Sequence, residues 1–245
     1  MTKKRKNRLR EMDGLYHCTS FCALNSIFQT QAFYPFFCLE EAAYLKKSLK
    51  FAFAVVSFAD MRYGELKEHM RQFSSDAYIK MSKEWAIRNT VSPVTYYSDK
   101  STLSSTIFRM LVNYAAKTNK DYEFYNPLNM FLGLLKQYRG YYYQKNLKKF
   151  SDHEVCFYLE REWRYLPLVM DHEAYFITED QFMNATIRTE KEKELVSKKY
   201  ILSFNWDDIL QVGVKPRNFI HAVGMLSNKF SVPWINAASK VKVMW

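Results

Sequence analysis

The stretch LYHCTS, residues 15–20, opens the first apolar run of the chain. In a β-strand, residues two positions apart point to the same face, so a strand here presents the side chains of His17 and Thr19 side by side. An imidazole and a hydroxyl on one surface can hydrogen-bond a polyhydroxylated ligand such as a ribose. They can equally belong to the edge of an ordinary strand, and both interpretations are open at this point.

Composition predicts a globular protein with a substantial core. The chain has 245 residues, is 48% hydrophobic and 17% aromatic, and contains only six glycines and six prolines; these values are typical of folded rather than disordered chains. Its longest apolar run, Phe51–Ala59, is too short to span a bilayer, so we expect no membrane association. The four cysteines form no CxxC pair, which predicts reduced thiols in a cytoplasmic protein.

The net charge of +11 raises the question of an acidic partner. Six basic residues lie within the first ten positions, and we expect residues 1–12 to form a basic tail. Because phosphate contact is mainly electrostatic, such a tail can bind nucleic acid, but it can equally bind an acidic partner protein. Further basic residues alternate with acidic ones in Thr189–Lys199, as on an exposed helix face.

The hydrophobic pattern mixes strands and helices without a regular βα repeat. Predicted strands cover residues 16–19, 51–58, 77–81, 93–97, 154–168, 200–204 and 211–215. Predicted helices cover residues 20–29, 40–49, 63–73, 82–89 and 219–229. Ser82 is the expected N-cap of its helix, since a serine hydroxyl accepts a hydrogen bond from a free first-turn amide.

The middle of the chain has a different pattern. Apolar residues recur at helical spacing in Leu103–Tyr114 and again in Leu128–Tyr142. We therefore predict a helical insertion near residues 101–150. No repeat and no Pro/Gly/Ser-rich linker divides the chain, so the prediction is one α+β domain over residues 13–245, with a split, mixed or antiparallel sheet flanked by helices.

Several common sites are excluded. The glycines form neither GxGxxG nor GxxxxGK[ST], and neither HExxH nor GxSxG occurs, which removes support for dinucleotide-fold dehydrogenases, P-loop NTPases and kinases. A zinc site from His17, Cys18 and Cys22 is conceivable. However, adjacent strand residues point to opposite faces and no second ligand pair follows at zinc-finger spacing, so we predict no metal.

The segment EVCFYLEREWRYLP, residues 154–167, carries the most chemistry. Strand alternation places Glu160, Glu162 and Arg164 on one face. If that face lines a cleft, the neighbouring negative charges raise the pKa of one carboxyl while Arg164 keeps the other ionised. The alternative, slightly favoured by the pattern alone, is an exposed strand whose charged side chains face water.

The segment DAYIKMSKEWA, residues 76–86, is a predicted strand that leads directly into the helix capped by Ser82. Tyr78 faces the same side as Lys80, and its ring could stack on a flat ligand ring. More often, a tyrosine in such a strand belongs to the core and places its hydroxyl at the rim. Trp85 is expected to pack in the core.

Five strings in this order resemble the AbiGi family, a group of bacterial abortive phage-infection proteins classed as antitoxins. They are LYHCTS, FAVVSFADM, AYIKMSKEWAIRNTVSPVTYY, FYLEREWRYLP and YILSFNWDDILQVGVKP, running from Leu15 to Pro216. SKEWAIRN and EREWRYLP are the specific parts. The sequence departs from the family pattern at Cys18, where an aromatic residue is usual, and at Ser75-Asp76-Ala77, which replaces a glycine-rich lead.

A more distant resemblance is to the His-Tyr-Glu arrangement of ADP-ribosyltransferases. It implies an ADP-ribosyltransferase-like fold. It also implies that His17 and Thr19 bind the ribose of NAD, that Tyr78 stacks on nicotinamide, and that Glu162 or Glu160 supplies the catalytic carboxylate. A fixed carboxylate stabilises the positive charge that develops as a glycosidic bond breaks.

Two functions follow as hypotheses. In the first, the chain is an antitoxin-like regulator in a phage-defence system and binds a toxin protein or nucleic acid. In the second, it is an ADP-ribosyltransferase-like enzyme that uses NAD to modify a nucleic acid or protein. The second requires His17, Tyr78 and a glutamate to share one cleft.

Overall fold

The computed structural model describes residues 14–44, 47–117, 131–144, 147–167, 176–197 and 199–245. The chain divides into two compact units. Unit 1 comprises Met1–Phe33, Ser57–Val91 and Leu202–Trp245, and unit 2 comprises Tyr34–Val56 and Ser92–Ile201. Because each unit is assembled from separate stretches of chain, no single linker marks the division in the sequence. The expected basic tail, residues 1–12, lies outside the described residues.

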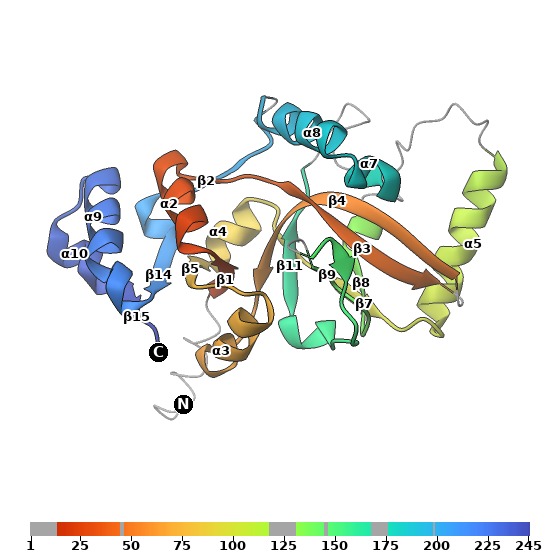
Figure 1. Ribbon diagram of the computed structural model, residues 1–245, viewed down its shortest axis with the longest axis horizontal. Coiled ribbons are helices and arrows are strands. Elements are labelled where there is room, and N and C mark those ends of the chain that lie inside the picture. The colour runs from red at the N-terminus through yellow and green to blue at the C-terminus, as the bar shows by residue number, and fades with distance from the viewer. Residues whose placement is uncertain (1–13, 45–46, 118–130, 145–146, 168–175, 198) are drawn as a thin grey trace. The chain divides into compact units, whose positions relative to one another are not determined.

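Unit 1 is built around the sheet order β15-β14-β5-β1, and β1 pairs at its other side with the end of β4 through Tyr16 and Ala59 (Figure 1). Strands β14 and β15 are parallel, while β14, β5 and β1 pair antiparallel. The elements of unit 1 are β1 (Gly14–Thr19), α2 (Phe21–Thr30), β2 (Ala32–Phe33), α3 (Tyr63–Gln72), β5 (Ala77–Ser82), α4 (Lys83–Arg88), β13 (Leu202–Ser203), η2 (Trp206–Asp208), β14 (Ile209–Val214), η3 (Pro216–Asn218), α9 (Phe219–Phe230), α10 (Trp234–Lys240) and β15 (Val241–Val243).

Two serines in unit 1 each cap the helix that follows a central strand. Ser20 follows β1 and accepts a hydrogen bond from the Ala23 amide at 3.1 Å. Ser82 ends β5 and accepts one from the Trp85 amide at the same distance, which confirms the predicted cap. Each cap satisfies a first-turn amide that would otherwise lack a partner.

Unit 2 is organised by the long hairpin of β3 and β4, which pair antiparallel from Phe36–Val55 to Tyr44–Lys47. Strand β12 pairs antiparallel with β4, β11 with β6, and β10 with β9, whereas β7 and β8 are parallel. The elements of unit 2 are β3 (Phe36–Tyr44), β4 (Lys47–Ala59, ending in unit 1), β6 (Ser92–Pro93), β7 (Thr95–Tyr97), α5 (Thr102–Lys117), β8 (Leu135–Gln137), β9 (Tyr143–Gln144), β10 (Lys149–Phe150), η1 (Phe157–Glu160), β11 (Glu162–Tyr165), β12 (Phe176–Thr178), α7 (Glu179–Met183) and α8 (Ala185–Ser197).

These elements confirm the α+β class with a mixed sheet, and they correct two predicted helices. Residues 40–44 form the end of β3 and residues 47–49 the start of β4, because pairing between these two strands outweighs local helix preference. The helical insertion is only partly right. Helix α5 confirms its first half, but Leu135–Gln137 is a strand that pairs with β7, and residues 118–130 lie outside the described part.

Candidate functional site

His17 and Thr19 lie on β1 and share a face, as predicted, opposite Ile79 and Ala77 of β5. The His17 ring packs against Phe33 and Phe58, with ring centroids 5.0 and 5.5 Å away. Its Nδ1 lies 2.9 Å from the Ser57 carbonyl oxygen, which can accept its hydrogen. Burial lowers the pKa of His17, outweighing the opposite effect of that hydrogen bond, and so favours the neutral ring.

Tyr78 lies on the other face of the same sheet. Its ring contacts that of Tyr16 edge to face at 5.3 Å and covers Gly213 of β14, where an added Cβ would lie 1.9 Å from the ring. Its hydroxyl donates to Gln211 Oε1 at 2.7 Å. Burial raises the pKa of Tyr78 well above its usual value. Tyr78 is therefore fully buried in the core of unit 1, and Gln211 satisfies its hydroxyl.

The structure thus brings together only part of the predicted NAD site. His17 and Thr19 share a face of unit 1, but Tyr78 points to the opposite face. Glu160 and Glu162 belong to unit 2. His17 and Tyr78 consequently cannot line one surface of their sheet, and the roles assigned to the five residues stay predictions.

Arg164 on β11 is the centre of a buried charge cluster in unit 2, which we call the Arg164 cluster: Glu40, Lys136, Glu160, Glu162 and Arg164. The arginine is 1% exposed. Its Nε donates to Glu162 Oε1 at 2.8 Å, and Nη1 donates to Glu40 Oε2 at 3.1 Å. Nη2 also donates to Glu40 Oε1, while Nη1 donates to the Gly133 carbonyl at 2.9 Å. The guanidinium therefore fixes β11 to β3 and to the residues before β8.

Lys136 on β8 is the second cation of the Arg164 cluster. Its Nζ lies 2.6 Å from Glu162 Oε2 and 3.3 Å from Glu160 Oε2. It also lies 4.6 Å from the centre of the Phe157 ring. Glu160 Oε1 is buried without a hydrogen-bond partner among the described residues.

The local chain path explains how both glutamates reach this cluster. The prediction of a continuous strand was wrong, because Phe157–Glu160 is a 3-10 helix and Arg161 adopts a left-handed conformation with φ 44° before β11 begins. That turn places Glu160 beside Glu162. Glu162 and Arg164 do share a strand face, as predicted. The interpretation that this face meets water was also wrong, because the side chains of Glu160, Glu162 and Arg164 are all buried.

Charge counting explains the protonation of the cluster. Three carboxylates face two cations, so one bound proton makes the group neutral. Burial, reinforced by the charge of Glu162, raises the pKa of Glu160 to about 7 despite the opposing charge of Lys136. Although burial alone would raise the pKa of Glu162, Arg164 and Lys136 lower it well below its usual range. The pKa of Glu160 is thus raised while Glu162 stays ionised, the division predicted for a face that lines a cleft, but burial rather than the neighbouring charge is the larger cause for Glu160.

The Glu160 proton makes a testable contribution to stability. Its folded-state pKa is about 7 and its ordinary value is 4.5. Between these two pKa values the folded chain keeps a proton on Glu160 that the unfolded chain releases. The free energy of unfolding therefore falls as the pH rises through that interval. Glu160→Gln cannot titrate. We expect its unfolding free energy relative to wild type to rise by on the order of 2 kcal/mol between pH 5 and pH 8.

Urea unfolding at several pH values measures this difference. The control is Glu190→Gln, which removes an exposed carboxylate from α8 of the same unit. A Glu160→Gln difference that stays constant from pH 5 to pH 8 would show that Glu160 holds no such proton.

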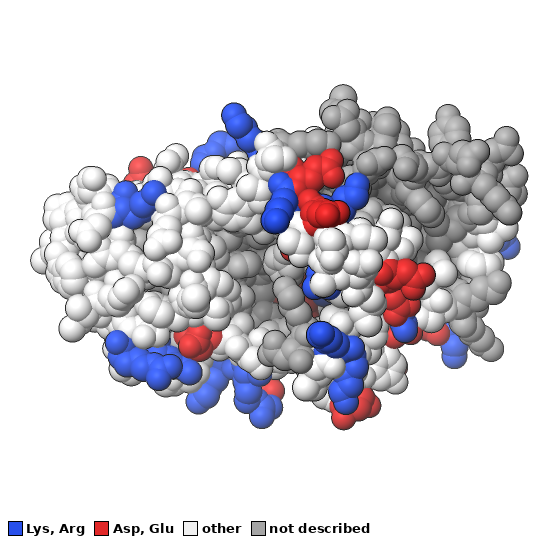
Figure 2. Space-filling view, turned by 45° about the horizontal axis from the view of Figure 1, so that its top comes forward, with Lys and Arg blue, Asp and Glu red and all other residues white. Residues whose placement is uncertain are grey.

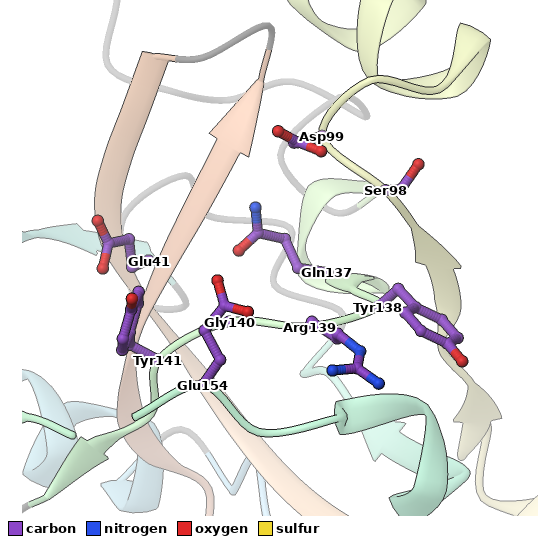
Figure 3. A pocket seen from close by; sticks show the side chains of 9 residues that line it. All are labelled: Glu41, Ser98, Asp99, Gln137, Tyr138, Arg139, Gly140, Tyr141 and Glu154. Carbon is purple, nitrogen blue, oxygen red and sulfur yellow. The ribbon is translucent and has the colours of Figure 1, made fainter. Parts of the chain in front are cut away.

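A separate polar cavity of about 350 Å³ also lies in unit 2. Three carboxylates, Glu41, Asp99 and Glu154, and one guanidinium, Arg139, help to line it, and the ring of Tyr138 points away from the others (Figure 3). Neighbouring strand residues point to opposite faces. Glu41 and Gln137 therefore reach this cavity from the side opposite to that of Glu40 and Lys136 in the Arg164 cluster.

Two further kinds of site find little support. Across the described residues, no group of three or more His, Cys, Asp or Glu side chains could hold a metal ion. Burial raises the pKa of the Cys18 and Cys38 thiols to about 12, so neither forms a thiolate nucleophile at neutral pH.

Among the described residues, no helix has both the length and the apolar character needed to cross a bilayer.

The geometry defines an α+β protein in which the charged residues of the Arg164 cluster pair with one another. Residues 31–215, about three quarters of the chain, match the model of the family described as "Putative abortive phage resistance protein AbiGi, antitoxin". The chain belongs to this AbiGi family of abortive phage resistance proteins. The match begins after LYHCTS, so that stretch is not part of it, whereas SKEWAIRN and EREWRYLP fall inside it.

No curated protein and no solved structure matches the chain. The ADP-ribosyltransferase fold accordingly stays a prediction. The two specific strings of the family resemblance have clear structural roles. SKEWAIRN supplies the Ser82 cap and the buried Trp85 in unit 1, and EREWRYLP supplies three members of the Arg164 cluster in unit 2.

Proposed function

We propose that this protein is the antitoxin of an abortive-infection system and that it neutralises a cognate toxin by binding that protein directly. Membership of the AbiGi family carries the proposal, since the matched family is one of abortive phage resistance antitoxins. An antitoxin of this kind needs a stable binding surface and no catalytic centre.

The Arg164 cluster supports a binding role over a catalytic one. Glu162 accepts hydrogen bonds from both Arg164 and Lys136, and Glu160 accepts one from Lys136. Both carboxylates are buried. Carboxylates held in this way connect β8 to β11 and to the 3-10 helix before it, and displacing them toward a substrate would break buried ion pairs.

Growth rescue tests the proposed function. The protein encoded next to this chain is expressed from an unrelated promoter, so that transcriptional repression cannot account for any effect. We expect that protein alone to arrest growth, co-expression of this chain to restore it, and the two proteins to co-purify as a complex. Continued arrest on co-expression would refute the antitoxin role, and rescue without a complex would refute direct binding.

A second candidate is NAD-dependent ADP-ribosyl transfer, which the opposite pKa shifts of Glu160 and Glu162 favour. His17, Thr19 and Tyr78 would then bind NAD, although His17 and Tyr78 lie on opposite faces of their sheet. Incubation with labelled NAD tests it. Label transfer that Glu162→Gln abolishes would support this activity, and absence of transfer by wild type would refute it.

A further inference from the structure

The C-terminal part of unit 1 carries an exposed apolar surface on two packed helices. We call it the α9–α10 surface: Arg217, Ile220, Gly224, Trp234 and Ile235. Ile220 is 74% exposed and Ile235 is 76% exposed. Trp234 is half exposed and lies across α9 at Gly224, where an added Cβ would sit 3.5 Å from its ring. Ile220 and Gly224 are four residues apart and therefore share one face of α9.

Charge on this part of the chain has a single sign. Residues 209–245, all of them described, contain five basic side chains and no acidic one. Three of the five have partners within the protein, since Lys229 and Lys240 donate to backbone carbonyls and Lys242 lies over the Tyr63 ring. Lys215 and Arg217 are exposed at the start of α9, beside Ile220.

The position of these two cations matters. A helix carries partial positive charge at its N-terminus, where acidic residues are favourable and basic ones are not. Helix α9 has no acidic residue in its first turn and is preceded by Lys215 and Arg217. An acidic group from a partner would compensate both the cations and the helix dipole. In Figure 2 the end of the molecule where Figure 1 places α9 and α10 is mostly white, with a blue patch and a smaller red one beside it.

We propose that the α9–α10 surface is where the protein binds its toxin, through an acidic segment of that toxin with apolar side chains on one face. The inference rests on the proposed antitoxin function and names the surface that performs it. The apolar side chains would enter the area around Ile220, Trp234 and Ile235, while acidic residues would meet Lys215 and Arg217. Tryptophan and arginine are enriched among the residues that dominate binding at protein interfaces.

Other occupants fit less well. Two exposed isoleucines contribute little to binding a phosphate backbone, which requires dense cations. A second copy of this chain would bring one positive surface against another, because a two-fold interface pairs the same patch on both subunits. The surface also lies beyond residue 215, where the family match ends.

Affinity measurements with the full-length chain and the adjacently encoded protein test the proposal. We expect Ile220→Glu combined with Ile235→Glu to weaken binding about 30-fold or more, because it places charge in the apolar centre of the interface. Ile87→Glu is the matched control, since Ile87 is 66% exposed on α4 of the same unit and lies outside the surface. The circular dichroism spectrum and the thermal unfolding of both variant proteins should match those of wild type.

A second variant tests the charge component. Lys215→Glu combined with Arg217→Glu should also weaken binding, and added salt should weaken wild-type binding toward that of the variant.

If wild type binds the toxin and the Ile220/Ile235 variant binds equally well, the proposed binding surface is wrong while the antitoxin function stands. If wild type forms no complex with the toxin, both the binding surface and the proposed antitoxin function are refuted. Self-association or oligonucleotide binding that the same substitutions abolish, without any effect on the toxin complex, would assign the surface to another occupant and overturn the proposal.

Discussion

Arg164→Ala should destabilise the protein by about 3–5 kcal/mol, the range expected when one partner of a buried ion pair is removed. The substitution leaves the buried Glu160 and Glu162 and the half-buried Glu40 with Lys136 as the remaining cation of the Arg164 cluster. It also removes a hydrogen bond to the Gly133 carbonyl. Since domain stabilities are typically about 5–15 kcal/mol, the loss would be a large share of the total.

Thermal and urea unfolding measure this loss. Arg109→Ala is the matched control, because Arg109 is exposed on α5 of the same unit. Arg164→Lys should fall between wild type and Arg164→Ala, since lysine keeps the charge but cannot reproduce the paired hydrogen bonds of a guanidinium. An Arg164→Ala protein as stable as Arg109→Ala would contradict the structural role assigned to the cluster.

Trp85→Ala should cost about 3–5 kcal/mol in unit 1 through loss of core packing. Trp85 is 1% exposed, and its ring contacts those of Phe33 and Phe58. Its Nε1 also donates to the Ser203 carbonyl at 3.0 Å, so the indole joins α4 to β13. Removing it leaves both a cavity and an unpaired carbonyl.

Urea unfolding again provides the measurement, with Trp245→Ala as the control because Trp245 is half exposed in the same unit. Trp85→Phe should recover much of the packing but not the hydrogen bond, and its stability should lie between those of wild type and Trp85→Ala. Equal losses for Trp85→Ala and Trp245→Ala would mean that Trp85 does not organise this core.

Local elements were predictable wherever a short-range signal determined them. Residues 15–20 gave β1 and the start of α2 because alternation is followed by a serine that caps the helix. The same signal at Ser82 gave β5 and α4. Helix prediction was wrong at residues 40–44, 47–49 and 135–137, where the chain forms strands. Residues 42–44 and 47–49 pair with each other across the β3–β4 hairpin, whereas β8 pairs with β7, about forty residues earlier in the chain; in both places strand pairing outweighs the local helical pattern.

The candidate site, like the fold, was predictable from the sequence only in its local features. The sequence by itself determined the residue types of EREWRYLP, the shared face of Glu162 and Arg164, and membership of the AbiGi family. Only the tertiary structure decided that these charges are buried, because Glu40 on β3 and Lys136 on β8 come from distant parts of the chain and no local pattern marks them as partners. It also decided that His17 and Tyr78 face opposite ways, since that depends on the register between β1 and β5, which is fixed by packing on both faces of the sheet.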